Sequence, residues 1–244
     1  MTARSVKGTT PEGAATEREA SQFVRSMFDR IVPRYDLANH LLSFNLDRYW
    51  RARTVAAVRG AGPKALDLCC GTGDLLLALE ADRGSPVWGS DFCHPMLTSA
   101  VVKATRRGFH SRVFESDALA IPVRDGSFDL VTVAFGFRNL ANYRKGLEEI
   151  HRILRPGGVA AILEFSQPPN PLFAGLYNFY SRHILPTLGG ALSGSKDAYT
   201  YLPESVRKFP SAEALAAQMR ETGFQNVKFK RMTGGIVCLH KAEK

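Results

Sequence analysis

The stretch that decides the fold is ALDLCCGTGD at residues 65–74. Its first six residues form a short apolar run, which predicts a buried strand. Gly71, Thr72 and Gly73 follow, and glycine lets the backbone turn sharply and approach a ligand because it lacks a Cβ atom. Asp74 then begins a segment with a helical pattern, whose first N–H groups would point at that ligand. A ligand-free tight turn would need the same glycines, so the motif alone does not define a site.

The same alternation of short strands and helices continues along the chain, which predicts an α/β fold with a mostly parallel sheet. Further strands are expected at residues 86–91, 111–114, 128–135 and 159–165, and helices at 74–81, 95–105 and 143–154. A last helix at 212–221 and two closing strands near 227–230 and 236–240 complete the pattern. Each connection is long enough for a right-handed crossover.

The chain is predicted to form one domain, residues 17–244, after a flexible polar tail at 1–16. Residues 17–62 have helical spacing of apolar side chains, interrupted at Pro33. Residues 166–210 break the strand–helix alternation with prolines, glycines and aromatics. We therefore expect N-terminal helices and an aromatic insertion that covers one edge of the sheet.

Composition restricts the class of protein and its partners. No apolar run of about 20 residues is present, and the first residues lack the apolar centre of a secretory signal, which predicts a cytoplasmic protein. The four cysteines fit neither a disulfide framework nor a zinc site, so no metal is expected. The net charge of +9 fits a solvated surface or attraction to an anionic membrane. Without a block of Lys and Arg, nucleic acid is not expected as a partner.

Three features of the predicted site favour S-adenosylmethionine over a dinucleotide. The glycine loop lacks the third glycine of the pyrophosphate-binding pattern. Asp74 follows the turn, where it could meet a positively charged amino or sulfonium group. Asp117 with Ala118, just beyond the third strand, lies where the methyltransferases that this arrangement resembles contact the adenine amine. Asp91, at the end of the second strand, could accept hydrogen bonds from ribose hydroxyls, a feature that is shared with NAD enzymes. The combination resembles the class I methyltransferase domain, whose Rossmann-like sheet is parallel with one reversed strand near its end.

A more specific resemblance extends from about Phe23 to the end of the chain. The sequence is similar to the quinone-biosynthesis C-methyltransferase family, which contains the demethylmenaquinone and ubiquinone-pathway enzymes. The resemblance is carried by Tyr35, Asp36, Asn39, Leu42, Ser43 and Trp50, by AFGFRN at 134–139, RILRPGG at 152–158, EFS at 164–166 and YLPESV at 201–206.

The resemblance implies that Thr72, Asp91, Asp117 and Ala118 contact the cofactor. The glycines 71 and 73 and the carboxylate at 74 complete the predicted cofactor site. Ala134 departs from the family, since several relatives have a cofactor-contacting serine at this position. Asp47 also departs, because many relatives have histidine there, which argues against an essential imidazole.

The implied reaction is methylation of a ring carbon of a reduced, isoprenoid quinol. Arg138 is the main catalytic candidate, because it directly follows the fourth strand and could stabilise a developing phenolate. Tyr199, Tyr201 and His183 are candidate helpers from the insertion. A structural salt bridge for Arg138, and simple packing for the tyrosines, remain the alternatives.

Several functional alternatives stay open at the level of sequence. The favoured substrate is demethylmenaquinol, and a ubiquinone-pathway benzoquinol also fits the family. A non-catalytic, cofactor-binding scaffold in a quinone-synthesis assembly is an alternative of another class. An RNA or protein methyltransferase is disfavoured by AFGF at 134–137, where amino-group methylases have an Asp or Asn, two prolines and an aromatic. Arg25, Arg30, Arg34 and the insertion are expected to bring the chain to the inner face of the membrane, and a homodimer is also open.

Overall fold

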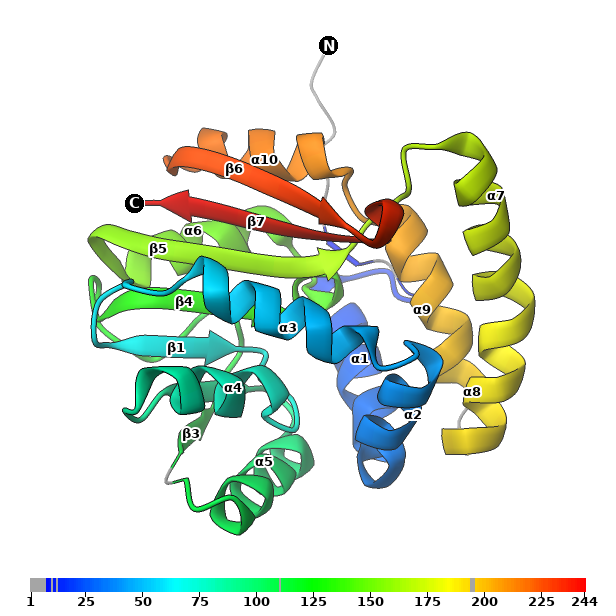
Figure 1. Cartoon of the computed structure of the whole chain (residues 1–244), viewed down its shortest axis with the longest axis horizontal. Helices are drawn as coiled ribbons and strands as arrows, with labels where there is room; N and C mark the ends of the chain where they lie inside the picture. Colours follow the sequence, from blue (N-terminus) through cyan, green and yellow to red (C-terminus); the bar gives the residue numbers. More distant parts are fainter. Residues whose placement is uncertain (1–7, 10, 12, 110, 194–195) are drawn as a thin grey trace.

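The fold is a seven-stranded sheet covered by helices on both faces (Figure 1). The computed structural model describes residues 8–9, 11, 13–109, 111–193 and 196–244. The strand order is β3-β2-β1-β4-β5-β7-β6. The strands are β1 (Ala65–Leu68), β2 (Trp88–Asp91), β3 (Arg112–Glu115), β4 (Phe128–Ala134), β5 (Leu154–Phe165), β6 (Gln225–Met232) and β7 (Val237–Glu243).

Strand β7 is the single reversed strand of this sheet. It pairs antiparallel with both β5 and β6, whereas β1 to β5 pair in parallel. This confirms the predicted class I methyltransferase topology. Two helices, α6 (Tyr143–Ile153) and α10 (Ala212–Glu221), cover one face of the sheet, and α3 (Leu46–Ala57), α4 (Asp74–Arg83) and α5 (His94–Arg106) cover the other.

Alternating side chains of the strands feed both layers of the core. In β1, Leu66 and Leu68 pack in the cluster that includes α6 and α10, whereas Ala65 packs in the cluster that includes α3 and α4. All four residues of β1 are buried. This is the burial expected of a strand in a sheet that is covered on both faces.

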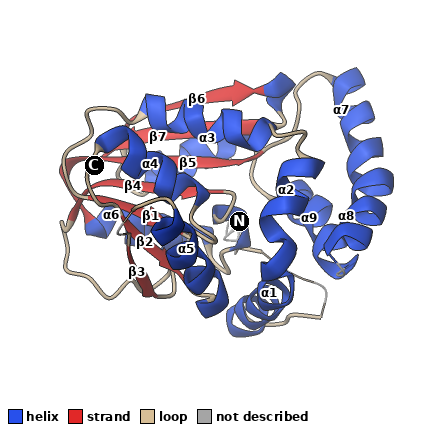
Figure 2. Ribbon diagram, turned by 60° about the horizontal axis from the view of Figure 1, so that its bottom comes forward, coloured by secondary structure: helices blue, strands red, loops and turns tan. Residues whose placement is uncertain are grey.

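The N-terminal helices and the insertion pack together beyond the carboxyl ends of the strands (Figure 2). The N-terminal part contains α1 (Glu17–Ile31), a 3₁₀ turn (Val32–Arg34) and α2 (Tyr35–Leu42). Pro33 lies in the 3₁₀ turn, so the predicted interruption is confirmed. The insertion contains α7 (Pro171–Phe179), a π-helical turn (Tyr180–Ile184), α8 (Leu185–Ser193) and α9 (Lys196–Lys208).

The largest difference from the predicted elements concerns β5. It begins at Leu154 and has 12 residues, whereas the sequence predicted a strand from Val159. The glycines 157 and 158 obscured the start of this strand in the sequence, because glycine normally marks a break. Among the described residues, no helix has both the length and the apolar character needed to cross a bilayer.

Candidate active site

The glycine turn after β1 opens onto a cavity at the carboxyl ends of β1, β2 and β4. The cavity and its solvent-filled mouth together have a volume of about 930 Å³. Gly71 has φ of +54°, and a Cβ atom built on it would meet nothing within 4 Å. It therefore leaves room for a ligand. Gly73 lies behind the turn instead, where a Cβ atom would approach that of Ala100 to 3.2 Å, and it does not line the cavity.

Asp91 lies at the end of β2 and lines this cavity with only 7% of its surface exposed. One carboxylate oxygen accepts a hydrogen bond from the Gly71 N–H at 2.9 Å, and the other accepts one from the Cys93 N–H at 2.9 Å. Burial raises the pKa of Asp91 to about 6, despite these donors. Further hydroxyl donors from a ligand would stabilise the ionised form.

Asp117 and Ala118 lie beyond β3 and line a wall of the same cavity, and their expected contact with the cofactor stays a prediction. Ala118 is buried, and Asp117 accepts a hydrogen bond from the Leu119 N–H at 2.9 Å. The side chains of Phe92 and Leu119 also line this wall. A carboxylate beside apolar side chains can bind an aromatic ring system that carries an exocyclic amine, because the apolar side chains pack on the ring and the carboxylate accepts a hydrogen bond from the amine.

Thr72 and Asp74 are joined to the N-terminal helices by a network of charges. The Thr72 hydroxyl donates to Asp36 at 2.5 Å, and Lys103 Nζ lies 2.5 Å from Asp36 and 2.8 Å from Asp74. Burial opposes ionisation of Asp74, but Arg51 and Lys103 outweigh it and lower its pKa. Asp74 is thus already paired with a cation of this chain, and its expected contact with the cofactor stays a prediction.

This cavity fits S-adenosylmethionine. The buried carboxylate of Asp91 at the end of β2 can accept hydrogen bonds from two ribose hydroxyls. The wall at Asp117 and Ala118 suits adenine, and the open space beside Gly71 lets the cofactor lie against the backbone of the turn. Ala134 lines the cavity where the resemblance placed a serine in relatives, so a side-chain hydroxyl is missing there.

A second, more apolar cavity adjoins the first, and together with its solvent-filled mouth it has a volume of about 2290 Å³. It is lined by α1, α2 and α3 on one side and by the insertion on the other. Four residues line both cavities: Phe28, Tyr35, Arg51 and Phe135. The two spaces therefore meet at a shared wall, which is the arrangement needed to bring a cofactor and an apolar acceptor into contact.

Arg138 lines the second cavity and is paired with Glu164 at the end of β5. Its Nη1 donates to Glu164 at 3.0 Å and also to the Phe135 carbonyl, and its backbone N–H donates to Glu164 at 3.1 Å. Burial alone would lower the pKa of Arg138, but Glu164 raises it above the usual range. The arginine is therefore a permanent cation at the cavity wall, and it also makes the salt bridge that the alternative interpretation expected.

The two predicted tyrosines of α9 both line the second cavity, and both are buried. The Tyr201 hydroxyl lies 2.7 Å from the Thr9 hydroxyl and 3.2 Å from the Asn139 side-chain oxygen. Burial raises the pKa of Tyr201, so its phenol stays protonated near neutral pH. Tyr199 is 4% exposed on the same helix. His183, by contrast, is exposed and lies outside the cavity lining, so its expected role as a helper gains no support and stays a prediction.

Sequence reasoning missed two residues of the shared wall, Tyr35 and Arg51. Arg51 pairs with Asp47 at 2.6 Å, lies 3.9 Å from Asp74 and stacks over Phe135 at 5.3 Å. Tyr35 was part of the family motif, but nothing in its spacing indicated a place between two cavities. Asp47 is buried and holds Arg51, Ser43 and His40, so the carboxylate at this position organises the wall.

The sheet order, the reversed strand and the acid-lined cavity define a class I methyltransferase that uses S-adenosylmethionine. Two solved structures share this fold. The [4+2]-cyclase SpnF has a TM-score of 0.69 at 18% identity, covering 98% of each chain. An S-adenosylmethionine-dependent methyltransferase from Thermotoga maritima has a TM-score of 0.62 at 19% identity, covering 90% of this chain and 99% of that one.

The chain belongs to the ubiE/COQ5 methyltransferase family, whose model matches residues 15–244. A demethylmenaquinone methyltransferase from Thermus thermophilus is 50% identical over 220 residues, which cover 89% of this chain and 100% of that protein. A ubiquinone/menaquinone biosynthesis C-methyltransferase UbiE from Geotalea uraniireducens is 44% identical over 231 residues, covering 93% and 98%. The predicted family resemblance is confirmed.

Proposed function

We propose that this chain transfers a methyl group from S-adenosylmethionine to a ring carbon of demethylmenaquinol, forming menaquinol. The observation that carries the proposal is the shared wall of Phe28, Tyr35, Arg51 and Phe135 between the acid-lined cavity and the apolar one. The name of the Thermus thermophilus relative, at 50% identity, supports the choice of substrate.

The residues at the carboxyl ends of the strands would bind the cofactor. Asp91 would accept hydrogen bonds from the ribose, Asp117 and Ala118 would hold the adenine, and Thr72 with Gly71 would border the amino-acid end. When bound, the cofactor supplies a methyl group on a positively charged sulfonium. The main contribution of the chain is to hold an acceptor carbon in line with that methyl group and to exclude water.

We propose that Arg138 stabilises negative charge on a quinol oxygen. It lines the apolar cavity, it is a permanent cation, and its Nε is buried without an acceptor among the described residues. A guanidinium is a poor base, so the phenolic proton leaves to water or to another group. Tyr201 and Tyr199, on the same wall, would orient the ring by hydrogen bonding and packing.

The ring carbon is nucleophilic only in the reduced substrate, so the quinol is methylated and the quinone is not. The experiment incubates the chain and S-adenosylmethionine with a short-tailed demethylmenaquinone, with and without dithionite, and analyses the product by mass spectrometry. Methylated product in the reduced sample alone supports the proposal. Equal product without reductant contradicts it.

A ubiquinone-pathway benzoquinol is the second candidate substrate, supported by the name of the Geotalea uraniireducens relative. The quinones of a strain that lacks this chain distinguish the two candidates through the demethylated compound that accumulates. Calorimetry with S-adenosylmethionine, run beside the turnover assay, tests the scaffold alternative, because a scaffold would bind the cofactor and give no methylated product.

The apolar cavity fits the isoprenoid part of such a quinol. Aromatic and aliphatic side chains from α7, the π-helical turn and α9 line it. We also propose that the chain meets this lipid substrate at the surface of an anionic membrane, which its charge of +9 favours. Removing the tail from the substrate should raise KM, and an unaltered KM would contradict the proposed tail site.

A further inference from the structure

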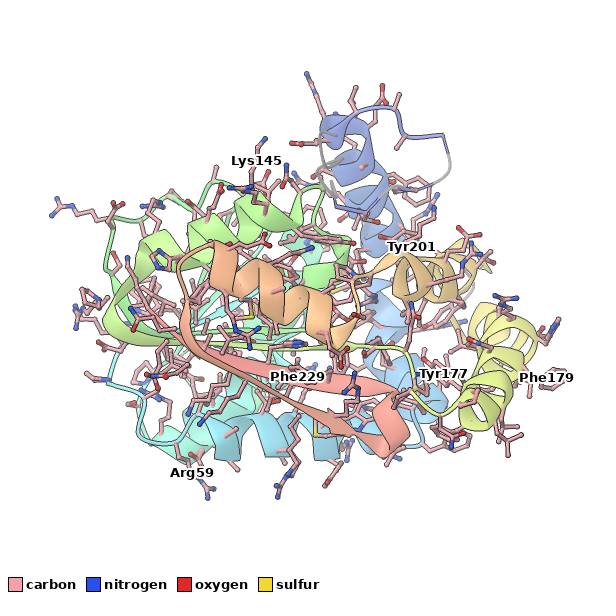
Figure 3. The ribbon with its side chains drawn as sticks, turned by 90° about the horizontal axis from the view of Figure 1, so that it is seen from above. Arg59, Lys145, Tyr177, Phe179, Tyr201 and Phe229 are labelled. Carbon is pink, nitrogen blue, oxygen red and sulfur yellow. The ribbon has the colours of Figure 1, made fainter. Side chains whose placement is uncertain are left out.

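Helix α7 carries the most exposed apolar side chains of the insertion. None of its nine residues is buried. Leu172 is 85% exposed, Leu176 is 66% exposed and Phe179 is 57% exposed. Their spacing of four and three residues puts all three on one side of the helix. Figure 3 shows Phe179 at the outer edge of the molecule, with Tyr177 on the inner side of the same helix.

The inner side of α7 is fixed to the body of the protein. Phe173 packs on the turn between β6 and β7, where a Cβ atom added to Gly234 would lie 2.5 Å from its ring. Asn170 caps the helix by accepting a hydrogen bond from the Phe173 N–H at 3.0 Å. The outward apolar side is therefore held in place on a packed helix.

Two further exposed apolar side chains lie on neighbouring elements. Leu188 of α8 is 50% exposed, and Phe44, between α2 and α3, is 75% exposed. The Phe44 ring lies 6.1 Å from that of Tyr180, which joins the two sides. We call the side chains of Phe44, Leu172, Leu176, Phe179 and Leu188 the outer apolar patch.

This patch borders the mouth of the apolar cavity. Phe44, Leu176 and Phe179 belong to the patch and also line the cavity. An apolar acceptor entering from the patch would pass into a cavity whose lining is mostly apolar. Exposed apolar side chains around the mouth of a water-filled groove are costly in water, unless a second apolar phase covers them.

The charge of the surrounding sequence identifies that phase. Residues 165–196 contain no Asp or Glu, although the whole chain has 23 in 244 residues. The same stretch contains one Arg, one Lys and one His. Arg182 is exposed and lines the apolar cavity together with three residues of the patch. An acid-free, weakly basic, apolar surface complements the interface of a bilayer with anionic lipid.

We propose that the outer apolar patch docks on an anionic bilayer and opens the apolar cavity directly to it, so that a lipid quinol enters without passing through water. This inference rests on the proposed function only for the identity of the quinol. Arg25, at first expected to contribute to membrane contact, pairs with Glu115 at 2.5 Å beside β3 and is not part of this surface.

The test measures sedimentation of the whole chain with phosphatidylcholine vesicles, with and without phosphatidylglycerol. The variant is Leu172→Glu with Leu188→Glu, because neither residue lines the cavity. The matched control is Val101→Glu with Val102→Glu, on α5, where the side chains are 41% and 45% exposed. We expect vesicle affinity to fall at least about tenfold in the patch variant, to stay unchanged in the control, and to be higher with phosphatidylglycerol.

Two further measurements separate the possible failures. Turnover of a short-tailed, water-soluble quinol should be equal in the wild type and the patch variant, which tests the catalytic proposal independently of docking. Sedimentation velocity tests whether a second copy of the chain covers the patch instead. The docking proposal would be overturned if the wild type fails to bind vesicles or if the patch variant binds them equally well. It would also be overturned if a dimer dissociates in the variant while vesicle binding persists.

Discussion

The buried pair of Arg138 and Glu164 determines how the proposed catalytic role can be tested. Their side chains are 8% and 1% exposed. Arg138→Ala would leave a buried carboxylate whose cationic partner is gone. Removing one partner of a buried ion pair costs about 3–5 kcal/mol, and we expect a loss of that size in the free energy of unfolding. For a chain of this length it corresponds to a fall in Tm of roughly 6–20 °C.

A lower turnover of Arg138→Ala therefore does not by itself separate catalysis from stability. The informative variant combines Arg138→Met with Glu164→Gln, which removes both charges and keeps most of the volume. Its stability should stay within about 1–2 kcal/mol of the wild type, because neither charge is left unpaired. Turnover should still fall about 100- to 1000-fold if Arg138 stabilises the developing oxyanion.

The assays are thermal unfolding, calorimetry with S-adenosylmethionine and kcat on a reduced short-tailed quinol. Arg144→Ala is the control, because Arg144 and Glu148 form an ion pair that is 73% and 51% exposed, and its loss should cost less than about 1 kcal/mol. Wild-type kcat in the double variant would refute the catalytic role of Arg138. An unchanged Tm in Arg138→Ala would refute the argument from the buried pair.

Three further predictions concern the cofactor cavity and the N-terminal segment. Burial raises the pKa of Asp91 to about 6, and ribose hydroxyls favour its ionised form. Cofactor affinity, measured by calorimetry, should therefore fall by up to about tenfold per pH unit as the pH drops below about 6. Asp91→Asn should flatten that pH profile. Burial raises the pKa of Asp67 to about 7, so its ionisation destabilises the fold progressively as pH rises from about 4 to 7. Asp67→Asn should therefore raise the free energy of unfolding, measured with denaturant, by the order of 2–4 kcal/mol at pH 7.5. The same variant should change it little at pH 4. In Gly8→Ala the new Cβ atom would lie 2.0 Å from the Leu140 carbonyl oxygen, which accepts a hydrogen bond from the Thr9 amide. The Thr9 amide should therefore lose protection from hydrogen exchange in this variant. Retained protection would contradict the contact.

The sheet and the cofactor cavity could be predicted from the sequence, because local signals encode both. The run at residues 65–74 gives a strand, a turn and a helix in the observed order, and Asp91 follows the next strand at the expected distance. Parallel strands end at one edge of a sheet, so the residues after them had to lie close together. Gly73 shows the limit of this reasoning, since only the packing against Ala100 reveals that it faces away from the cavity.

The second cavity was harder to predict, because it is built from contacts between distant parts of the chain. Arg51 and Tyr35 come from the N-terminal helices, and the tyrosines that line the same cavity come from α9, about 150 residues later. Lys103 reaches Asp36 and Asp74 from α5, and no local pattern marks it. The contact of Thr9 with Tyr201 lies in a segment whose composition predicted a flexible tail.

The distribution of charge around the shared wall agrees with the charge changes of the proposed reaction. Asp91 and Asp117 line the cofactor cavity, Arg138 lines the acceptor cavity, and Arg51 lines both. Methyl transfer consumes a cation and a phenolate together, so an unopposed buried cation would hold the phenolate too tightly and make its carbon less nucleophilic. Glu164 lies 3.0 Å from Arg138 and offsets part of its charge. We infer that this pairing lets the arginine lower the pKa of a quinol hydroxyl without trapping the anion, which explains why a salt bridge and a catalytic role can belong to the same residue.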